Sequence, residues 1–195
     1  MDESILTFWF GENPDELTRE QMLRWFRSDP AFDQAIAQRF GKLYKAAVNG
    51  AFRDWCERPR GRLALLIMLD QFSRNLHRES PLAWSQDAKC LDIARLGLEE
   101  EHDRVLRPVE RVFFYMPFQH SEDVRDQAAS VRLYQDLYSD YPDLTFVERS
   151  LKSAEYHHQL VTQFGRFPHR NHILGRETTE PEREYLASLP PGKRF

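Results

Sequence analysis

Leu63-Ala-Leu-Leu-Ile-Met-Leu-Asp-Gln-Phe-Ser-Arg-Asn75 is the stretch of sequence that decides the fold. Its first part, residues 63–69, is apolar on every side, which is the pattern of a helix buried on all its faces. After Phe72 the sequence becomes polar at once. We therefore expect a central buried helix that ends in charged and amide groups, with the other elements packed around it.

Apolar residues recur at helical spacing along nearly the whole chain, which predicts a succession of amphipathic helices. Prolines and glycines mark several of the predicted ends. The predicted helices run from just after Pro30 to near Gly50, over 82–98 with Pro81 in the first turn, over 109–118 ending around Pro117, over 124–138, and over 147–161 up to a stop at Gly165.

Two predicted helix starts carry capping signals. Ser121, followed by Glu122 and Asp123, is predicted to be an N-cap with acids near the positive end of the helix. Thr179, with Glu182 three residues later, fits a capping box that opens a short final helix.

These patterns predict an all-α fold and give no convincing signal for a strand. We expect about seven to eight helices in antiparallel pairs, joined by short connections, as a bundle or a short solenoid. No fixed-period repeat is visible, so a regular repeat array is not expected. No boundary stands out along the sequence, and residues 1–195 are predicted to form a single helical domain.

The composition restricts the classes of partner and compartment. The chain has 195 residues, of which 41% are hydrophobic, and a net charge of −4, which argues against nucleic acid and membrane surfaces as partners. It contains no apolar run near the roughly 18 residues that span a bilayer, and its N-terminus has no basic targeting region. Cys56 and Cys90 lack metal-site spacing and are predicted to be buried or half-buried free thiols. A cytoplasmic location is expected, and the sequence does not indicate an oligomeric state.

The first candidate site follows the central apolar run. Asp70 and Arg74 are four residues apart, as are Gln71 and Asn75, so each pair shares a helix face. An arginine at the end of a buried helix must be paired or must contact a ligand. The structural alternative is that Asp70 and Arg74 form an internal ion pair while the two amides bind loop backbone.

A second group of candidates lies around His120. This residue is expected just before a helix N-terminus, which favours a neutral imidazole that can act as a general base or bind a ligand. Glu122 and His157 are candidates for the same site. A capped helix start and a packed core histidine are the structural alternatives.

The third candidate region is the segment from Gln163 to Thr179, where Gly165 and Pro168 exclude one regular helix. Arginine side chains in such a shaped turn suit carboxylates and phosphates. A polar lock that ties the segment to the other helices is the structural alternative. The candidate residues of the segment are Arg166, His169, Arg170, Asn171 and Arg176.

Motifs of several well-known chemistries are missing from the sequence. It contains no HExxH, no cysteine-rich zinc pattern, no P-loop, no GxSxG and no dinucleotide-binding glycine motif. No metal site and no cofactor are therefore predicted.

Several stretches of the chain are similar to a widespread, mostly bacterial family of unassigned function, the domain-of-unknown-function family numbered nine-two-four. The resemblance runs from Ile5 to Phe195. It implies an all-helical fold like that of the tetratricopeptide superfamily, without its regular repeat, and it implies no activity. Ser73 departs from the family pattern, which has proline there, and should relax a turn slightly. The stretches that carry the resemblance are Phe8-Trp9-Phe10, Trp25-Phe26, Leu69–Phe72 with Arg74-Asn75, Tyr115-Met116-Pro117, His120–Asp123 with Gln127, His157, and Phe164–Asn171 with Leu174-Gly175-Arg176.

Three hypotheses for the function remain open at this point. The first is a binding module that takes a small anionic molecule or a peptide carboxylate in a pocket lined by arginine and histidine. The second is a hydrolase or lyase in which a histidine and a carboxylate form an acid–base pair. The third is a structural or protein-interaction scaffold whose polar motifs are helix locks. The first two require the candidate groups to converge in space, which is itself a prediction.

Overall fold

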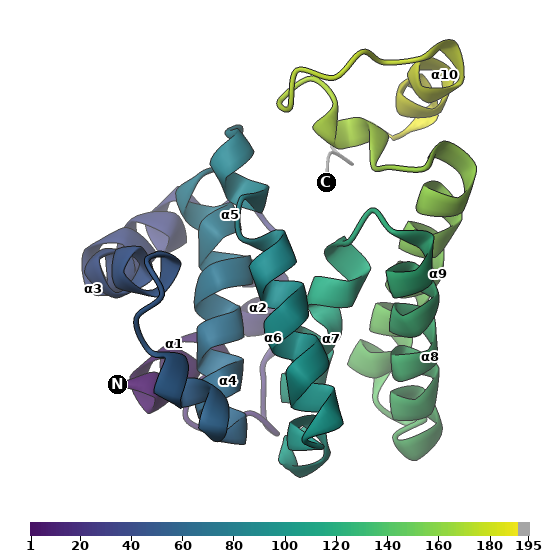
Figure 1. Ribbon diagram of the computed structural model, residues 1–195. Coiled ribbons are helices and arrows are strands. Elements are labelled where there is room, and N and C mark those ends of the chain that lie inside the picture. The colour runs from purple at the N-terminus through teal and green to yellow at the C-terminus, as the bar shows by residue number, and fades with distance from the viewer. Residues whose placement is uncertain (191–195) are drawn as a thin grey trace.

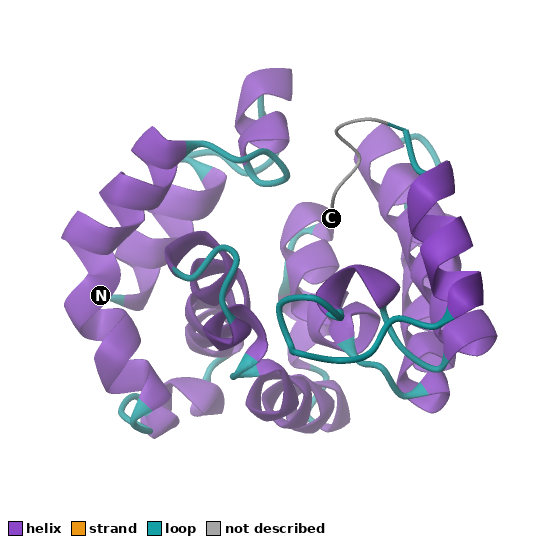
Figure 2. Cartoon of the chain, turned by 90° about the horizontal axis from the view of Figure 1, so that it is seen from above, coloured by secondary structure: helices purple, strands orange, loops and turns teal. Residues whose placement is uncertain are grey.

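The computed structural model describes residues 1–190, and this part of the chain is helical, with no strand (Figures 1 and 2). Residues 191–195 of the predicted domain lie outside the described residues. The all-α class is confirmed, and the number of helices in the described part is close to the prediction when the shortest ones are set aside. The α-helices are α1 (Asp2–Phe10), α2 (Arg19–Arg24), α3 (Pro30–Val48), α4 (Pro59–Leu66), α5 (Ser73–Leu76), α6 (Asp87–Glu99), α7 (Pro108–His120), α8 (Val124–Asp140), α9 (Thr145–Phe164) and α10 (Glu180–Ser188).

The predicted central helix is present and lies in the middle of the molecule. Helix α4, a π-helical turn at Ile67–Phe72 and helix α5 follow one another without a break. Residues 63–69 are at most 3% exposed, because α4 lies against α1, α6 and α7 (Figure 1). An apolar sequence on every helix face is thus matched by neighbours on every face.

Aromatic side chains from distant parts of the chain fill the core beside this helix. The rings of Trp25 and Phe113 lie 4.7 Å apart, edge to face, and Phe10 contacts the same ring at 5.3 Å. The indole Nε1 of Trp25 donates a hydrogen bond to the backbone oxygen of Trp9 at 3.0 Å. Such edge-to-face pairs contribute about 0.5–1.5 kcal/mol each beyond their buried area. The aromatic motifs near the N-terminus therefore serve packing.

Helices α7, α8 and α9 pack side by side as antiparallel neighbours, because short connections join them (Figure 1). The hydroxyl of Tyr134 in α8 donates to the backbone oxygen of Val112 in α7 at 2.8 Å. The side-chain amide of Gln127 donates to the backbone oxygens of Gln119 and Ser121 at 2.7 and 2.6 Å. Gln127 thereby satisfies carbonyl groups that the end of α7 leaves free.

The end of α7 differs from the prediction in two ways. The helix does not stop around Pro117 but continues to His120. Proline removes only one helical hydrogen bond, and the side chain of Gln127 satisfies the last carbonyl groups. Ser121 closes α7 and is not the N-cap of α8. That role belongs to Asp123, whose carboxylate accepts from the backbone N–H of Arg125 at 2.8 Å.

The helix predicted over 82–98 is interrupted. Residues Pro81–Trp84 form a 3-10 turn, and α6 begins only at Asp87. Ser85 explains the break, because its hydroxyl donates to the backbone oxygen of Leu82 at 2.9 Å and competes with helical bonding.

Other expectations are met. Gly165 ends α9 in the left-handed region at φ 69°, and the carboxylate of Glu182 accepts from the backbone N–H of Thr179 at 2.7 Å. Cys56 is half-buried and Cys90 is buried, and neither is in a disulfide. None of the helices in the described part is both long and apolar enough to cross a membrane.

The close packing of α6 against its neighbours at Gly97 leads to a prediction on stability. A Cβ atom at Gly97 would lie 2.5 Å from the ring of Phe114 and 2.6 Å from Cδ of Arg62. Arg62 cannot move aside easily, because its guanidinium donates to the backbone oxygen of Cys56 at 2.6 Å. We expect Gly97→Ala to lower the free energy of unfolding in urea by about 1–3 kcal/mol through overpacking.

Gly41→Ala is the matched control, because a Cβ there has nothing within 4 Å. It lies inside α3, so the substitution should raise the free energy of unfolding by up to about 1 kcal/mol. Equal effects of the two substitutions would contradict the packing described for α6.

Candidate functional site

The site begins at the widened turn of the central helix. Asp70 and Gln71 lie in the π turn Ile67–Phe72, and turns of this kind are frequent at functional sites. Ser73 lies in the helix that continues from it, where its hydroxyl donates to the backbone oxygen of Leu69 at 2.5 Å and contacts the hydroxyl of Tyr44 at 3.1 Å. The expectation that Ser73 relaxes a turn is wrong, because the chain is helical at this position.

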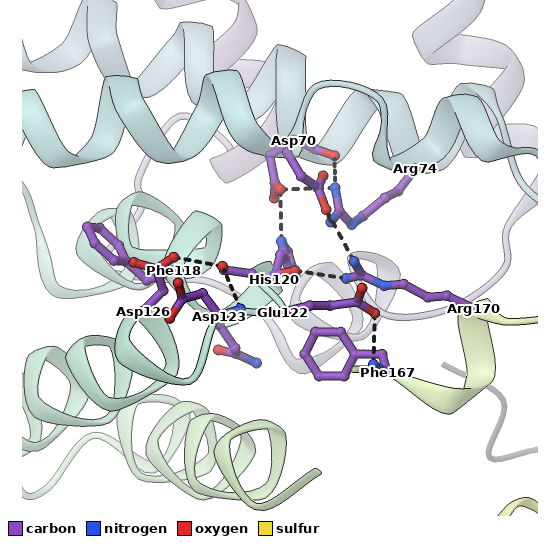
Figure 3. Close-up of polar contacts among 12 residues, drawn as sticks. Asp70, Arg74, Phe118, His120, Glu122, Asp123, Asp126, Phe167 and Arg170 are labelled. Atoms are coloured by element: carbon purple, nitrogen blue, oxygen red, sulfur yellow. Dashed lines mark hydrogen bonds and ion pairs between the residues drawn. The ribbon is translucent and has the colours of Figure 1, made fainter. Parts of the chain in front are cut away.

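Asp70 is the most deeply buried charge of the site, with 2% of its side chain exposed. Its Oδ1 forms an ion pair with Nη1 of Arg74 at 2.9 Å and lies 2.8 Å from Nδ1 of His120 (Figure 3). Nη1 of Arg74 donates its hydrogen bond to the backbone oxygen of Asp70, at 2.9 Å. The side-chain amide of Gln71 also donates to this carboxylate. Burial by itself would raise the pKa of Asp70, but the charges of Arg74 and His120 lower it well below its ordinary range. Asp70 is therefore ionised.

Asp87, at the start of α6, links two arginines. Its Oδ2 lies 3.0 Å from Nη2 of Arg74 and 3.5 Å from Nη1 of Arg170. Its Oδ1 is buried and accepts no hydrogen bond from the described residues. Burial raises the pKa of Asp87, and it outweighs the lowering effect of the arginines. This role was not predicted, because an acid in the first turn of a helix ordinarily indicates a favourable charge at the helix end.

Arg170 projects from the 3-10 turn Pro168–Arg170, and only 8% of its side chain is exposed. Its guanidinium lies 4.6 Å from the ring centre of Phe167 and 5.4 Å from that of Trp84. Nη2 donates to the backbone oxygen of His120 at 3.1 Å, whereas Nε has no hydrogen-bond partner among the described residues. Burial, together with the positive charge of Arg74, lowers the pKa of Arg170 to about 10.

We name Asp70, Arg74, Asp87, His120 and Arg170 the Asp–Arg–His cluster. Its members come from the central helix, the start of α6, the end of α7 and the C-terminal segment (Figures 1 and 3). Arg74, Asp87 and His120 form its solvent side, with 22%, 17% and 16% of their side chains exposed. The structure thus brings Asp70, Arg74, His120 and Arg170 together. Both the binding hypothesis and the enzyme hypothesis require this, and the role of these residues in binding stays a prediction.

A second set of candidates forms closed ion pairs beside the cluster. Glu122 accepts from Nη1 and Nη2 of Arg176 at 2.7 and 3.0 Å, and its Oε1 also accepts from the backbone N–H of Phe167 at 2.8 Å. These bonds lower the pKa of Glu122 although burial alone would raise it. Glu122 and Arg176 thereby fasten the segment around Phe167 to the turn before α8.

Glu182 in α10 fastens the other end of the same segment. It accepts from Nε and Nη2 of Arg166 at 2.6 and 2.8 Å, and from the side-chain amide of Asn171 at 3.2 Å. The bond from Arg166 is the main cause that lowers the pKa of Glu182 to about 2. Glu182 was expected as a capping residue, but its role as the acceptor for Arg166 and Asn171 was missed. We name the pairs of Glu122 and Glu182 the C-terminal lock.

His157 and His169 both contact Phe167, with ring centres 5.3 and 5.6 Å from its ring. Nδ1 of His157 is also 3.0 Å from the side-chain amide nitrogen of Gln119. Burial lowers the pKa of His157 to about 4, and burial with the charge of Arg170 lowers that of His169 to about 3. Both imidazoles are therefore neutral at pH 7, and both pack against the aromatic ring that Arg170 also contacts.

The amides of the central helix separate from each other. Gln71 stays beside Asp70 and approaches the sulfur of Met116 at 3.3 Å. Asn75 instead donates to the carboxylate of Asp33 in α3 at 2.7 Å. Gln71 and Asn75, which were predicted to share a helix face, therefore contact different parts of the molecule.

Two pockets lie elsewhere on the described part of the molecule. One, of about 270 Å³, is lined by α1, the loop after it, Arg60, Arg107 and Glu110. Three of its charged groups are already paired, since Arg60 donates to both Glu3 and Glu110. The other, of about 460 Å³, lies between the end of α9 and α10. Neither pocket includes a residue of the Asp–Arg–His cluster.

Fold and site together define an all-helical protein with a buried cluster of acids, arginines and a histidine where its central helix meets its C-terminal segment. The chain belongs to the family described as "Bacterial protein of unknown function (DUF924)", whose model matches residues 5–189, so the recognised family is confirmed. It is similar to the solved structure of the protein of unknown function ATU0120 from Agrobacterium tumefaciens. That chain shares 37% identity and a TM-score of 0.81, over 95% of this chain and 96% of its own. The curated proteins contain no match.

The C-terminal lock gives a prediction on pH. A carboxylate whose pKa is lowered on folding stabilises the fold above its unfolded pKa, and this stability is lost as the pH falls through the folded pKa. For Glu182 the loss falls between its ordinary value of 4.5 and about 2. We expect the protection of the α10 amides, relative to their intrinsic exchange rates, to fall as the pH falls through this window, and Glu182→Gln to show low protection already at pH 7.

Glu184→Gln is the control, because Glu184 lies in the same helix and is exposed. It should leave the exchange in α10 unchanged. If Glu182→Gln also left it unchanged, the C-terminal lock would have no energetic role.

Proposed function

We propose that the Asp–Arg–His cluster binds a small molecule through a single carboxylate group. The proposal rests above all on Arg170, a buried cation whose pairing is incomplete. Hydrogen bonds between arginine and a carboxylate are usually bidentate and 2.7–2.9 Å long. Arg170 is instead 3.5 Å from Asp87 through one nitrogen, and its Nε is unpartnered among the described residues.

The charges of the cluster support a monoanion as the ligand. Arg74 and Arg170 carry two positive charges, and Asp70 and Asp87 carry two negative charges when both are ionised. A further negative charge is accommodated best if Asp87 takes up a proton, and burial raises the pKa of Asp87 in that direction. A monovalent carboxylate is therefore favoured over a phosphate dianion, which would need two compensating protons.

The structural alternative fits the C-terminal lock better than the cluster. Glu122 with Arg176, and Glu182 with Arg166, form short bidentate pairs between folded segments. Arg170 has neither a short carboxylate contact nor a bidentate one. The C-terminal lock therefore holds the segment in place, and Arg170 is the residue of the segment that binds the ligand.

A substitution that removes the charge of Arg170 tests the proposal. Arg170→Met keeps most of the side-chain volume between Phe167 and Trp84. We expect it to weaken binding of acetate and benzoate at least about 10-fold in calorimetric titration, since hydrogen bonds to charged groups contribute about 1.5–3 kcal/mol. Inorganic phosphate is the comparison ligand and should bind the wild type more weakly than either carboxylate.

The free energy of unfolding in urea separates binding from locking for the same variant. A buried charge kept for a ligand costs stability, so Arg170→Met should unfold at the same or a higher urea concentration. A loss of about 3–5 kcal/mol would mark Arg170 as a structural partner and would overturn the proposal. Arg132→Met, which removes an exposed arginine of α8, is the control for the change in net charge.

Asp87 gives a second test, because it is paired with Arg170, to which the ligand would bind. Asp87→Asn removes the competing carboxylate but can still accept a hydrogen bond. We expect this variant to bind acetate and benzoate about 10-fold more tightly at pH 7, since one charged interaction no longer has to be broken. The affinity of the wild type should rise on acidification, whereas that of Asp87→Asn should change much less. Equal pH dependence in the two proteins would exclude Asp87 as the competitor.

A further inference from the structure

The pair of Asp70 and His120 extends the proposed function from binding to catalysis. We propose that this pair hydrolyses an ester whose other end carries the carboxylate bound by the cluster, with His120 as the general base and Asp70 as its positioning residue. The inference rests on the proposed carboxylate site, because the arginines must hold the substrate beside the imidazole.

The geometry assigns different roles to the two nitrogens of His120. Nδ1 lies 2.8 Å from Oδ1 of Asp70, and Asp70 is ionised, so Nδ1 carries the hydrogen that is donated. In the neutral imidazole, Nε2 then holds the lone pair, and no described residue forms a hydrogen bond with it. The side chain is 16% exposed, on the solvent side of the cluster. The imidazole is thus fixed at one nitrogen and available at the other, which a general base requires.

The backbone of His120 is held as well as its imidazole. His120 is the last residue of α7, and its backbone oxygen accepts from Nη2 of Arg170 at 3.1 Å. Asp70 in turn lies in the π turn of the central helix and is held by Arg74 at 2.9 Å. The general base and the arginine proposed to bind the carboxylate are therefore attached to each other directly.

The other cations around His120 complete the arrangement. Arg74 is bound to both Asp70 and Asp87 and is the most exposed arginine of the cluster, at 22%. It can stabilise the negative charge that develops on an ester oxygen while Arg170 holds the carboxylate. Asp87, the remaining acid, faces the two arginines.

The reaction consumes one water molecule and balances as follows. Nε2 of His120 takes a proton from water as the water oxygen bonds to the carbonyl carbon, and the electron pair of the C=O bond moves to its oxygen. The resulting oxyanion collapses and the bond to the alcohol oxygen breaks. That oxygen takes the proton back from Nε2. The products are a carboxylic acid and an alcohol, and the imidazole is regenerated as the neutral base.

A monoanionic ester and its neutral analogue test the inference. We expect the wild type to hydrolyse 4-acetoxybenzoate faster than methyl 4-acetoxybenzoate, because only the first carries a carboxylate for Arg170. His120→Gln should lower kcat at least about 100-fold, which is the lower end of the contribution of general acid–base catalysis. His172→Gln is the control, because His172 is an exposed histidine of the C-terminal segment. It should leave the rate unchanged.

The pH profile separates catalysis from structural support. The rate of the wild type should fall on acidification, because a protonated imidazole cannot accept a proton. Asp70→Asn should lower kcat with little change in KM, and the small residual rate of His120→Gln should no longer follow the wild-type profile. Circular dichroism and urea unfolding check that each variant is folded. If Asp70→Asn does not fold, the comparison of His120→Gln with the wild type is the test.

Binding of the non-hydrolysable amide 4-acetamidobenzoate distinguishes the two levels of the proposal. If the wild type binds it but does not hydrolyse the ester, or if His120→Gln hydrolyses the ester at the wild-type rate, the catalytic inference is overturned and the binding site stands. If the wild type does not bind the amide, the proposed function fails first.

Discussion

A buried carboxylate organises this molecule. Asp70 sits where the apolar central helix ends, and the ionised group can be buried there only because it is paired. Its partners are Arg74 from the next turn and His120 from the end of α7. Through Arg74 the network reaches Asp87 in α6, and through His120 and Asp87 it reaches Arg170. The pairing of one acid therefore connects four separate parts of the chain.

Local chemistry made much of this predictable from the sequence. The apolar run at 63–69, the pairing of Asp70 with Arg74 and the stop at Gly165 each follow from neighbours within a few positions. Asp87 and Glu182 could not be recognised as partners of distant arginines, because a sequence without coordinates does not show which helix ends meet. The error at Pro117 has a similar origin, since the carbonyls beyond it are satisfied by Gln127 from the next helix.

The arginines of the C-terminal segment illustrate how one residue type serves two purposes. Arg166 and Arg176 form short contacts with carboxylates and keep the segment folded against its neighbours. Arg170 lies between them in sequence but is held mainly by aromatic rings and a backbone oxygen. Composition and spacing treat the three alike, and only the position of the acids separates them. A rigid frame around one poorly paired cation is how proteins preorganise a binding group.

The π turn at Ile67–Phe72 gives the central helix two independent angular registers. Successive residues of an α-helix are about 100° apart around the axis, so a local change in winding rotates everything that follows it. The apolar part before the turn and the polar part after it are therefore not bound to one shared face. The widened turn thus sets the angle between the face of α4 that packs against α1 and α6 and the direction of Arg74. A change in winding over one turn therefore brings the polar end of a buried helix to His120 of α7 and Asp87 of α6 without a break in the helix.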